Sequence, residues 1–243
     1  MSFPNPLAGR TRIKICGLTR EQDVDAAAAA GADAIGLVLY RKSRRYVTPQ
    51  RAAELARRLP PFMTPVLLFV NETPANVRAA CNLIGNAAVQ FHGDESPADC
   101  LAATGNGARP FIRAARIPLA DANSFDLLEF AANYRQAQAI LVDAHVEGYG
   151  GGGKSFNWSR LPPSVTCHLV LSGGLTPANV GDGIAQVRPR CRTLAVDVSS
   201  GVEADGPDSQ GVKDPVKINS FVAAVRAADA LLEHSIHVQL SAT

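Results

Sequence analysis

The chain has 243 residues, of which 47% are hydrophobic and 19% are charged. This length suits one large domain, and the apolar content supplies a sizeable core, which excludes disorder over the whole chain. The net charge of +2 is too balanced to indicate a surface for nucleic acid or for a membrane. The wholly apolar runs are far too short to span a bilayer, and the N-terminus lacks the apolar stretch of a signal peptide.

Cysteine usage indicates a reducing compartment. The chain has five cysteines, which is an odd number, and no C-x-x-C pair. Neither a disulfide framework nor a cysteine zinc site fits such widely spaced residues. We therefore expect free thiols and a cytoplasmic protein.

Apolar runs rich in Val, Ile and Leu predict eight buried strands. Their hydrophobicity is continuous rather than alternating, which is typical of a parallel sheet covered by helices. The runs begin about 22 to 31 residues apart, which leaves room for a crossover helix in each interval. The expected strands are Arg12–Cys16, Ala34–Tyr40, Pro65–Val70, Ala87–Phe91, Pro110–Ala114, Ala139–Asp143, Cys167–Leu171 and Thr193–Val198.

Expected helix starts combine a capping side chain with a following proline. The capping oxygen satisfies a free backbone amide, and proline lacks only a donor that the first helical position does not use. This pattern occurs at Thr48-Pro49, Thr73-Pro74, Ser96-Pro97, Thr176-Pro177 and Asp214-Pro215. In addition, Thr19-Arg20-Glu21-Gln22 predicts a capping box, and Gly31 is expected to end that helix in a left-handed conformation.

Eight strand–helix units without a break in composition predict an α/β protein, a single-domain (β/α)8 TIM barrel over residues 12–228. Residues 1–11 and 229–243 are expected to be terminal extensions, either sealing the barrel ends or disordered. The alternative is an open doubly wound sheet. Its usual G-x-G-x-x-G fingerprint is missing after the first strand.

In such barrels the active site lies at the carboxyl ends of the strands. Cys16 ends the first strand, and Lys14 is expected to face the barrel axis beside it, where an ammonium lowers the pKa of a thiol. Asp143 ends the sixth strand after four apolar residues, where burial would raise its pKa and let it donate a proton near neutral pH. The structural alternatives are a buried small side chain for Cys16 and a loop cap or salt bridge for Asp143.

His92 and Asp197 occupy the ends of the fourth and eighth expected strands. With Asp143 they are compatible with a metal site, because histidine and carboxylate ligands suit divalent ions. Three residues on separate strands form a weak pattern, and we expect no metal.

Glycine-rich segments follow the last three strands. Glycine lets backbone amides approach an anion closely, and phosphate sites after strands seven and eight are common in this fold. We therefore expect phosphate binding at Gly173, Gly174, Ser199, Ser200 and Gly201. The run Gly150–Gly153 is either part of that site or a mobile lid.

A basic cluster follows the second expected strand. It consists of Arg41, Lys42, Arg44 and Arg45. Such a cluster is either a solvated loop or, beside a phosphate site, a means of holding a second anionic group through a guanidinium.

Together these segments resemble the phosphoribosylanthranilate isomerase family, in family order from about Arg12 to Arg226. The matching segments are Lys14-Ile15-Cys16-Gly17-Leu18-Thr19, Ser43-Arg44-Arg45-Tyr46-Val47, Val89-Gln90-Phe91-His92-Gly93, Leu141-Val142-Asp143-Ala144, Ser172-Gly173-Gly174-Leu175-Thr176-Pro177, Val196-Asp197-Val198-Ser199-Ser200-Gly201-Val202-Glu203 and Gly211-Val212-Lys213-Asp214. The resemblance implies a step of tryptophan biosynthesis, the third from chorismate.

The reaction that the resemblance implies is an Amadori rearrangement of N-(5-phosphoribosyl)anthranilate to 1-(2-carboxyphenylamino)-1-deoxyribulose 5-phosphate. It implies Cys16 as general base, Asp143 as general acid and Arg45 as the group that holds the substrate carboxylate. The glycine loops would hold the phosphate. It implies no metal or organic cofactor, and a phosphosugar-binding monomer or homodimer.

Three positions depart from the family pattern. Gly152 stands where threonine is usual, Asn157 where aspartate is usual, and Arg41 where proline is common. The extra glycine makes closure of the sixth loop more costly in entropy. We therefore expect these changes to affect loop order rather than the proton-transfer residues.

Two other functions compete with this interpretation. One is a different phosphosugar isomerase or epimerase, which needs either a metal or an aspartate in place of Cys16. The other is a non-catalytic sensor of a phosphorylated metabolite. A sensor has no use for an acid–base pair, and the chain retains both Cys16 and Asp143.

Overall fold

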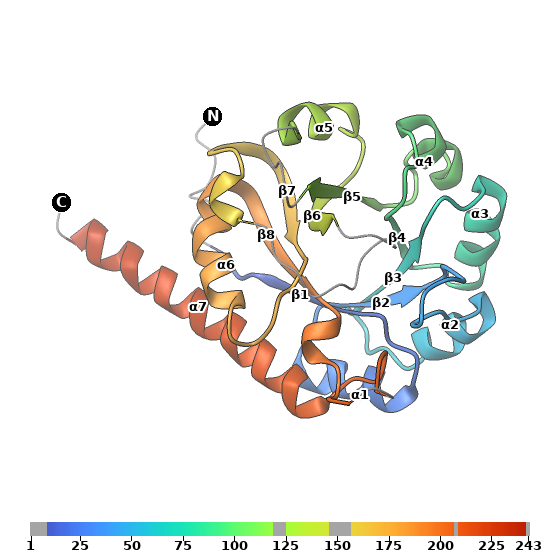
Figure 1. Cartoon of the computed structure of the whole chain (residues 1–243), viewed down its shortest axis with the longest axis horizontal. Coiled ribbons are helices and arrows are strands. Elements are labelled where there is room, and N and C mark those ends of the chain that lie inside the picture. Colours follow the sequence, from blue (N-terminus) through green and yellow to red (C-terminus); the bar gives the residue numbers. More distant parts are fainter. Residues whose placement is uncertain (1–8, 119–124, 146–156, 207–208, 242–243) are drawn as a thin grey trace.

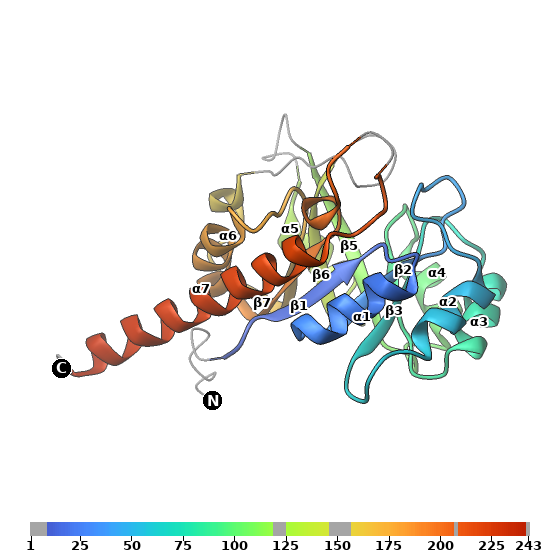
Figure 2. The same ribbon diagram turned by 90° about the horizontal axis from the view of Figure 1, so that it is seen from below.

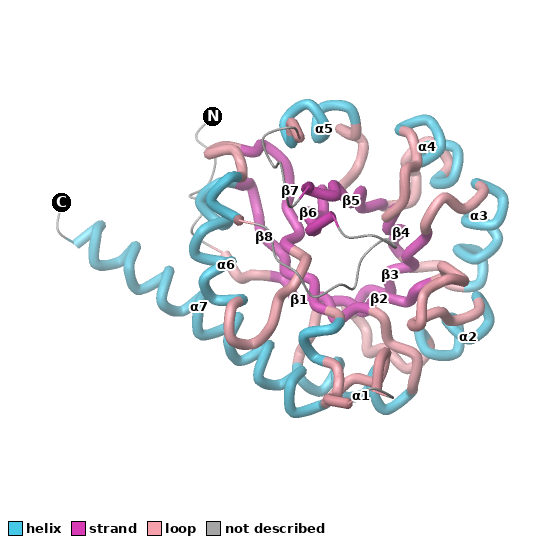
Figure 3. Tube along the Cα trace, in the orientation of Figure 1, coloured by secondary structure: helices cyan, strands magenta, loops and turns pink. Residues whose placement is uncertain are grey.

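A computed structural model of the chain describes residues 9–118, 125–145, 157–206 and 209–241. Eight parallel strands form a closed barrel in sequence order, β1 to β8, and the helices lie around it (Figures 1 and 3). The predicted (β/α)8 barrel is confirmed, and the open sheet is wrong because β1 pairs with β8. The apolar core lies mainly between the strands and the surrounding helices.

All eight predicted strands are present, with ends that shift by a few residues. Their bounds are β1 Arg12–Cys16, β2 Ala34–Val38, β3 Thr64–Phe69, β4 Ala88–Phe91, β5 Phe111–Pro118, β6 Ala139–His145, β7 Val165–Leu171 and β8 Cys191–Val198. The largest changes are at β5 and β6, which pair with each other as far as Pro118 and His145. Asp143 therefore lies within β6 rather than at its end.

Helices cover the outer face of the barrel. Their bounds are α1 Glu21–Ala30, α2 Pro49–Ala56, α3 Pro74–Leu83, α4 Pro97–Thr104, α5 Leu127–Asn133, α6 Val180–Val187 and α7 Pro215–Ser241, with short 3-10 turns at η2 Trp158–Arg160, η3 Arg188–Arg190 and η4 Ser200–Val202. A crossover helix was expected in every interval. Between β6 and β7 the described residues contain only η2, and residues 146–156 lie outside the described part.

Most of the predicted helix starts are confirmed. The hydroxyls of Thr48 and Thr73 accept hydrogen bonds from the backbone amides of Arg51 and Asn76. Ser96 forms a full capping box with Asp99. At α7, the carboxylate of Asp214 accepts from the amide of Val216. Gly31 ends α1 with φ 85°, as expected for a left-handed cap.

Two helix starts are wrong. The capping box between Thr19 and Gln22 does not form, because α1 begins at Glu21 and its N-cap is Arg20, which makes no side-chain capping hydrogen bond. Helix α6 begins at Val180 rather than after Thr176-Pro177. There the side chain of Asn179 accepts from the Thr176 amide and donates to the Gly174 carbonyl, which holds a turn before the helix.

Helix α7 continues past residue 228, where the barrel domain was expected to end, and projects beyond the barrel (Figure 2). Inside this helix the carboxylate of Asp229 accepts hydrogen bonds from the amide and hydroxyl of Thr11, at 2.7 and 2.6 Å. Arg188 donates to the same carboxylate at 2.6 Å. These buried contacts attach α7 to the start of β1. The exact domain boundaries stay a prediction.

Two expectations drawn from composition can be compared with the fold. All five cysteines are free, as predicted, and four of them are buried. Within the described residues, no helix combines the length and apolarity needed to cross a bilayer.

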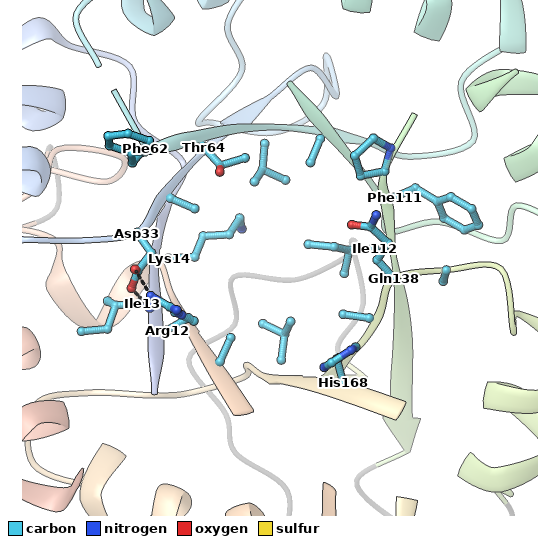
Figure 4. A pocket seen from close by; sticks show the side chains of 18 residues that line it. Arg12, Ile13, Lys14, Asp33, Phe62, Thr64, Phe111, Ile112, Gln138 and His168 are labelled. Carbon is cyan, nitrogen blue, oxygen red and sulfur yellow. Dashed lines mark hydrogen bonds and ion pairs between the residues drawn. The ribbon is translucent and has the colours of Figure 1, made fainter. Parts of the chain in front are cut away.

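A cavity of about 760 Å³ opens at the amino end of the barrel, opposite the predicted active site (Figure 4). Small side chains such as Ala88, Ala139 and Ala195 line it and leave this part of the barrel unfilled. Phe62 lies at its edge, fully exposed, with a left-handed φ of 71°. The lining also includes charged and polar side chains such as Arg12, Asp33 and His168, so an exposed aromatic ring lies beside a cavity of mixed polarity.

Candidate active site

Cys16 lies buried at the carboxyl end of β1, against β2. A Cβ atom at Gly36 would lie 2.5 Å from the Cys16 sulfur and 3.0 Å from Nζ of Lys14. Only glycine leaves room for both side chains at this point, because such close approaches do not occur in stable packing. The thiol and the ammonium therefore share one small space inside the barrel.

Lys14 also bridges to the last strand. Its Nζ lies 2.8 Å from Oδ1 of Asp197, and both side chains are buried. The two residues are direct partners in the register that closes the barrel between β1 and β8. Barrel closure thus brings Asp197 beside Lys14 and Cys16, the two residues that were expected to lie together.

The pKa of the Cys16 thiol is raised, in contrast to the expected net lowering. Burial is the largest cause, and the charge of Asp197 adds to it. Lys14 does lower this pKa, as expected, but it does not outweigh the other two. Less thiolate is therefore present at neutral pH, but the thiolate that forms is a stronger base.

Asp143 and His92 form the second buried pair of the site. Nε2 of His92 lies 3.1 Å from Oδ2 of Asp143, and Nδ1 of His92 lies 3.0 Å from the amide nitrogen of Gln90. The two ring nitrogens of His92 thus contact Gln90 on one side and Asp143 on the other. A Cβ atom at Gly173 would lie 2.7 Å from Oδ1 of Asp143, so glycine is needed there as well.

The three candidate metal ligands do not converge. His92 pairs with Asp143, whereas Asp197 pairs with Lys14. Across the described ranges, no three His, Cys, Asp or Glu side chains are arranged to hold a metal ion. The arrangement is that of two separate ion pairs rather than of one ligand set.

The predicted phosphate loops lie next to each other. Gly173 and Gly174 follow β7 in left-handed conformations, with φ 80° and 64°, while Ser200 and Gly201 belong to η4 after β8. Gly201 packs so closely on the carbonyl oxygen of Leu175 that a Cβ atom would collide with it. Both loops therefore border one region at the mouth of the barrel.

Arg45 reaches this region from the loop after β2. Its Nε and Nη2 lie 2.6 and 3.1 Å from the two carboxylate oxygens of Glu203. Its aliphatic part crosses Gly17, whose φ of 78° and missing side chain allow the contact. The Arg45 side chain therefore lies against Gly17, the residue that follows Cys16 in the sequence.

The other three residues of the basic cluster point elsewhere. Arg41, Lys42 and Arg44 are exposed, and Arg44 hydrogen-bonds Gln210. The guanidinium of Arg41 lies 5.9 Å from the ring centre of Tyr46. The cluster is therefore mostly a solvated loop, and Arg45 alone of these four contacts Glu203.

Three residues of the candidate site were not singled out from the sequence. Gln90 lies on β4, two positions before His92, which directly follows the strand, and this spacing could have identified it. Glu203 and Lys213 appeared only as parts of matching segments. Their contacts with Arg45 and with each other depend on how the loops after β2 and β8 fold, so no local sequence pattern predicts these contacts.

The family profile described as N-(5′phosphoribosyl)anthranilate (PRA) isomerase matches residues 13–224. The chain belongs to the N-(5′-phosphoribosyl)anthranilate isomerase family. A relative of this name from Leptothrix cholodnii is 59% identical over 221 residues, which cover 91% of this chain and 93% of the relative.

Two solved structures of the isomerase family are also similar, each covering 89% of this chain and 99% of its own. One, in complex with reduced 1-(o-carboxyphenylamino)-1-deoxyribulose 5-phosphate, is 35% identical with a TM-score of 0.70. The other, of monomers generated from the dimeric Thermotoga maritima enzyme, is 34% identical with a TM-score of 0.69.

Of the two departures in the sixth loop of this isomerase, one can be described. The Oδ1 atom of Asn157 accepts hydrogen bonds from the amide and hydroxyl of Ser159, at 3.1 and 2.8 Å, and so caps η2. An aspartate would make the same contacts, so Asn157 removes a charge without removing the cap. Gly152 and the rest of Gly150–Gly153 lie outside the described residues.

Replacing Gly174 with valine is expected to raise KM by about ten-fold or more and to weaken inhibition by inorganic phosphate. A β-branched residue resists the left-handed conformation at φ 64° and crowds the loop where amides must face an anion. Steady-state kinetics with phosphate as inhibitor measures both effects.

Gly105→Val is the matched control, because Gly105 has the same φ of 64° but ends α4, away from the loops. It should lower stability without changing phosphate inhibition. Unchanged inhibition in a folded Gly174→Val variant would place the phosphate elsewhere.

Proposed function

We propose that Cys16 and Asp143 perform the proton transfers by which this isomerase converts N-(5′-phosphoribosyl)anthranilate in tryptophan biosynthesis. The proposal rests on one observation: the Cys16 thiol and the Asp143 carboxyl group are both buried, and each lies beside a charged or polar partner of its own. A thiol on β1 lies beside the Lys14–Asp197 ion pair, and a carboxyl group on β6 lies against His92. A base and an acid are thus supplied by different strands of one barrel mouth.

The first step opens the sugar ring. Asp143, in its protonated form, donates its proton to the furanose ring oxygen as the bond from that oxygen to C1′ breaks. The nitrogen lone pair then forms the C1′–N double bond of a protonated Schiff base. The Nε2 proton of His92 stabilises the carboxylate left on Asp143, because a hydrogen bond to a charged acceptor is stronger than one to a neutral acceptor.

The second step moves hydrogen away from C2′. The Cys16 thiolate removes the C2′ proton, and the electron pair of that bond forms the C1′–C2′ double bond of an enolamine, while the C1′–N bond becomes single. Tautomerisation then places a proton on C1′ and leaves the ketone at C2′. Carbon is oxidised at C2′ and reduced at C1′, so the reaction needs no external oxidant or reductant.

Two anionic ends of the substrate need separate anchors. The glycine loops after β7 and β8 offer backbone amides to the phosphate. Arg45, on the loop after β2, offers a planar guanidinium to the anthranilate carboxylate. In this arrangement the reacting carbons lie between the two anchors, next to Cys16 and Asp143.

Deuterium at C2′ of the substrate tests the proposed base. In the wild-type reaction the label should leave C2′ in step with product formation, which NMR of the product detects. In Cys16→Ser the label should stay at C2′ of substrate that is bound but not converted. A non-catalytic sensor would bind the product without moving any label in the wild-type protein, and that result would exclude the proposal.

We further propose that the protein is a homodimer joined at the amino ends of its barrels, rather than a monomer. Phe62 stands fully exposed at the edge of the 760 Å³ cavity. In a two-fold symmetric pair, each Phe62 ring can enter the cavity of the other copy. The dimeric relative from Thermotoga maritima supports a dimer as the state to test.

Phe62→Asp is therefore expected to convert the dimer to monomers, since it removes the ring that would fill the partner's cavity and a charged side chain in its place would have to lose its water. Sedimentation equilibrium measures the change. Leu83→Asp, at an exposed leucine of α3, is the control and should leave the dimer intact. A wild-type protein that sediments as a monomer at micromolar concentration would exclude this interface.

A further inference from the structure

Four residues form a continuous chain of contacts between the two proposed anion sites. Arg45 makes two hydrogen bonds to Glu203, and Nζ of Lys213 lies 3.1 Å from Oε1 of Glu203. The same ammonium donates to the carbonyl oxygen of Ser199 at 2.9 Å. The Ser199 hydroxyl in turn donates to the carbonyl oxygen of Cys16 at 3.1 Å. This series of contacts therefore also reaches Cys16 on β1.

The two central members of this chain, Lys213 and Glu203, are shielded from water. The side chain of Lys213 is 0% exposed and that of Glu203 is 7% exposed. Burial opposes the charge of Glu203, but Arg45 and Lys213 outweigh it and lower its pKa to about 2. One carboxylate therefore stands between two cations, and the group carries one net positive charge. That charge matches the single carboxylate of the proposed substrate.

The geometry of the guanidinium leaves room for a second anion. Glu203 occupies the edge of Arg45 formed by Nε and Nη2. The edge formed by Nη1 and Nη2 is a separate fork, and no described residue accepts a hydrogen bond from Nη1. Arg45 can therefore hold Glu203 and a ligand carboxylate at the same time. Glu203 then acts as a support for Arg45 rather than as a competitor.

We propose that Glu203 is a positioning residue, which with Lys213 fixes Arg45 relative to the phosphate loop and so sets the spacing at which a carboxylate and a phosphate are bound together. The inference rests on the proposed function, because the role of Arg45 in binding the carboxylate is itself proposed. It goes beyond that function in naming what holds Arg45 in place. It predicts selectivity for ligands that carry both anions over ligands that carry only the phosphate.

A double-mutant cycle between Glu203→Gln and Arg45→Ala tests this role. The dissociation constants of the reaction product and of ribose 5-phosphate are measured by calorimetry for the wild type, both single variants and the double variant. Glu203→Gln should weaken product binding about ten-fold and raise KM similarly, with kcat and ribose 5-phosphate affinity nearly unchanged. In the Arg45→Ala background, Glu203→Gln should have almost no further effect on product binding.

Asp205→Asn is the matched control on the same loop. Asp205 pairs with Lys217, and its side chain is 93% exposed, so its loss should change neither constant. Glu203→Asp is the second variant, since it keeps the charge but is too short to contact Arg45 and Lys213 together. It should weaken product binding to an intermediate degree.

Additive effects in the cycle would overturn the proposal, and so would an equal loss of affinity for product and for ribose 5-phosphate. If circular dichroism shows that neither Glu203 variant folds, Glu203 serves stability and the proposal is wrong. These outcomes are distinct from a failure of the proposed function. That failure would appear as absent turnover in the wild-type protein, whereas the cycle is judged on binding alone.

Discussion

Replacing Cys16 with serine is expected to lower kcat by about 10²–10⁴-fold, the usual contribution of one general base. A hydroxyl has nearly the shape of the thiol but loses its proton far less readily, so the C2′ proton would stay in place. Product should still bind, because Arg45 and the glycine loops are unchanged. Steady-state kinetics and calorimetry with the product measure the two effects separately.

Cys167→Ser provides the control for thiol removal in general. Cys167 is a free, partly exposed cysteine of β7. Its replacement should leave kcat near the wild-type value. If Cys16→Ser kept a near-normal kcat while binding product, the assignment of the base would be wrong.

Asp143→Asn is expected to cause a loss of the same order, because the amide cannot supply the proton that opens the sugar ring. The amide keeps the size of the carboxyl group beside His92 and Gly173. Folding should therefore persist, and circular dichroism checks it. A substrate analogue that already has an open chain should recover part of the rate, whereas it should not help Cys16→Ser.

The second large effect is expected at Arg45. Arg45→Ala should weaken binding of substrate and product by about ten- to a hundred-fold, since a hydrogen bond to a charged group contributes roughly 1.5–3 kcal/mol. Affinity for ribose 5-phosphate should stay nearly unchanged. Arg45→Lys should restore only part of the loss, because an ammonium lacks the planar fork. Calorimetric titration with both ligands gives this comparison.

Arg44→Ala is the neighbouring control. Arg44 is exposed and hydrogen-bonds Gln210, so its loss should leave product binding unchanged. A weaker affinity for product in Arg44→Ala, with normal affinity in Arg45→Ala, would move the carboxylate site from Arg45 to its neighbour.

Local patterns predicted the barrel well because each strand is buried on both faces and so reads as a continuous apolar run. They failed at the ends of some elements. Thr19 and Gln22 have the spacing of a capping box, but Arg20 is the N-cap of α1 and pairs with Asp23. The ends of β5 and β6 were missed because their pairing continues into polar residues such as Arg116 and His145.

For the candidate site, position at or near expected strand ends singled out Cys16, Asp143 and His92 as candidates from sequence alone. The side-chain contacts of the site could not be predicted from positions along single strands. Glu203 contacts Arg45 across 158 positions of sequence, and Lys14 contacts Asp197 across 183. These pairs exist because the barrel closes between β1 and β8. The pKa of Cys16 was misjudged because it depends on Asp197 and on burial as well as on Lys14.

The central claim is that this protein isomerises N-(5′-phosphoribosyl)anthranilate through Cys16. The most direct test follows the fluorescence of this substrate with the purified wild-type protein and Cys16→Ser at equal concentrations. We expect rapid conversion to the ketose by the wild type and a loss of about 10²–10⁴-fold in Cys16→Ser. No conversion by a folded wild-type protein that binds the product, or equal conversion by both proteins, would contradict it.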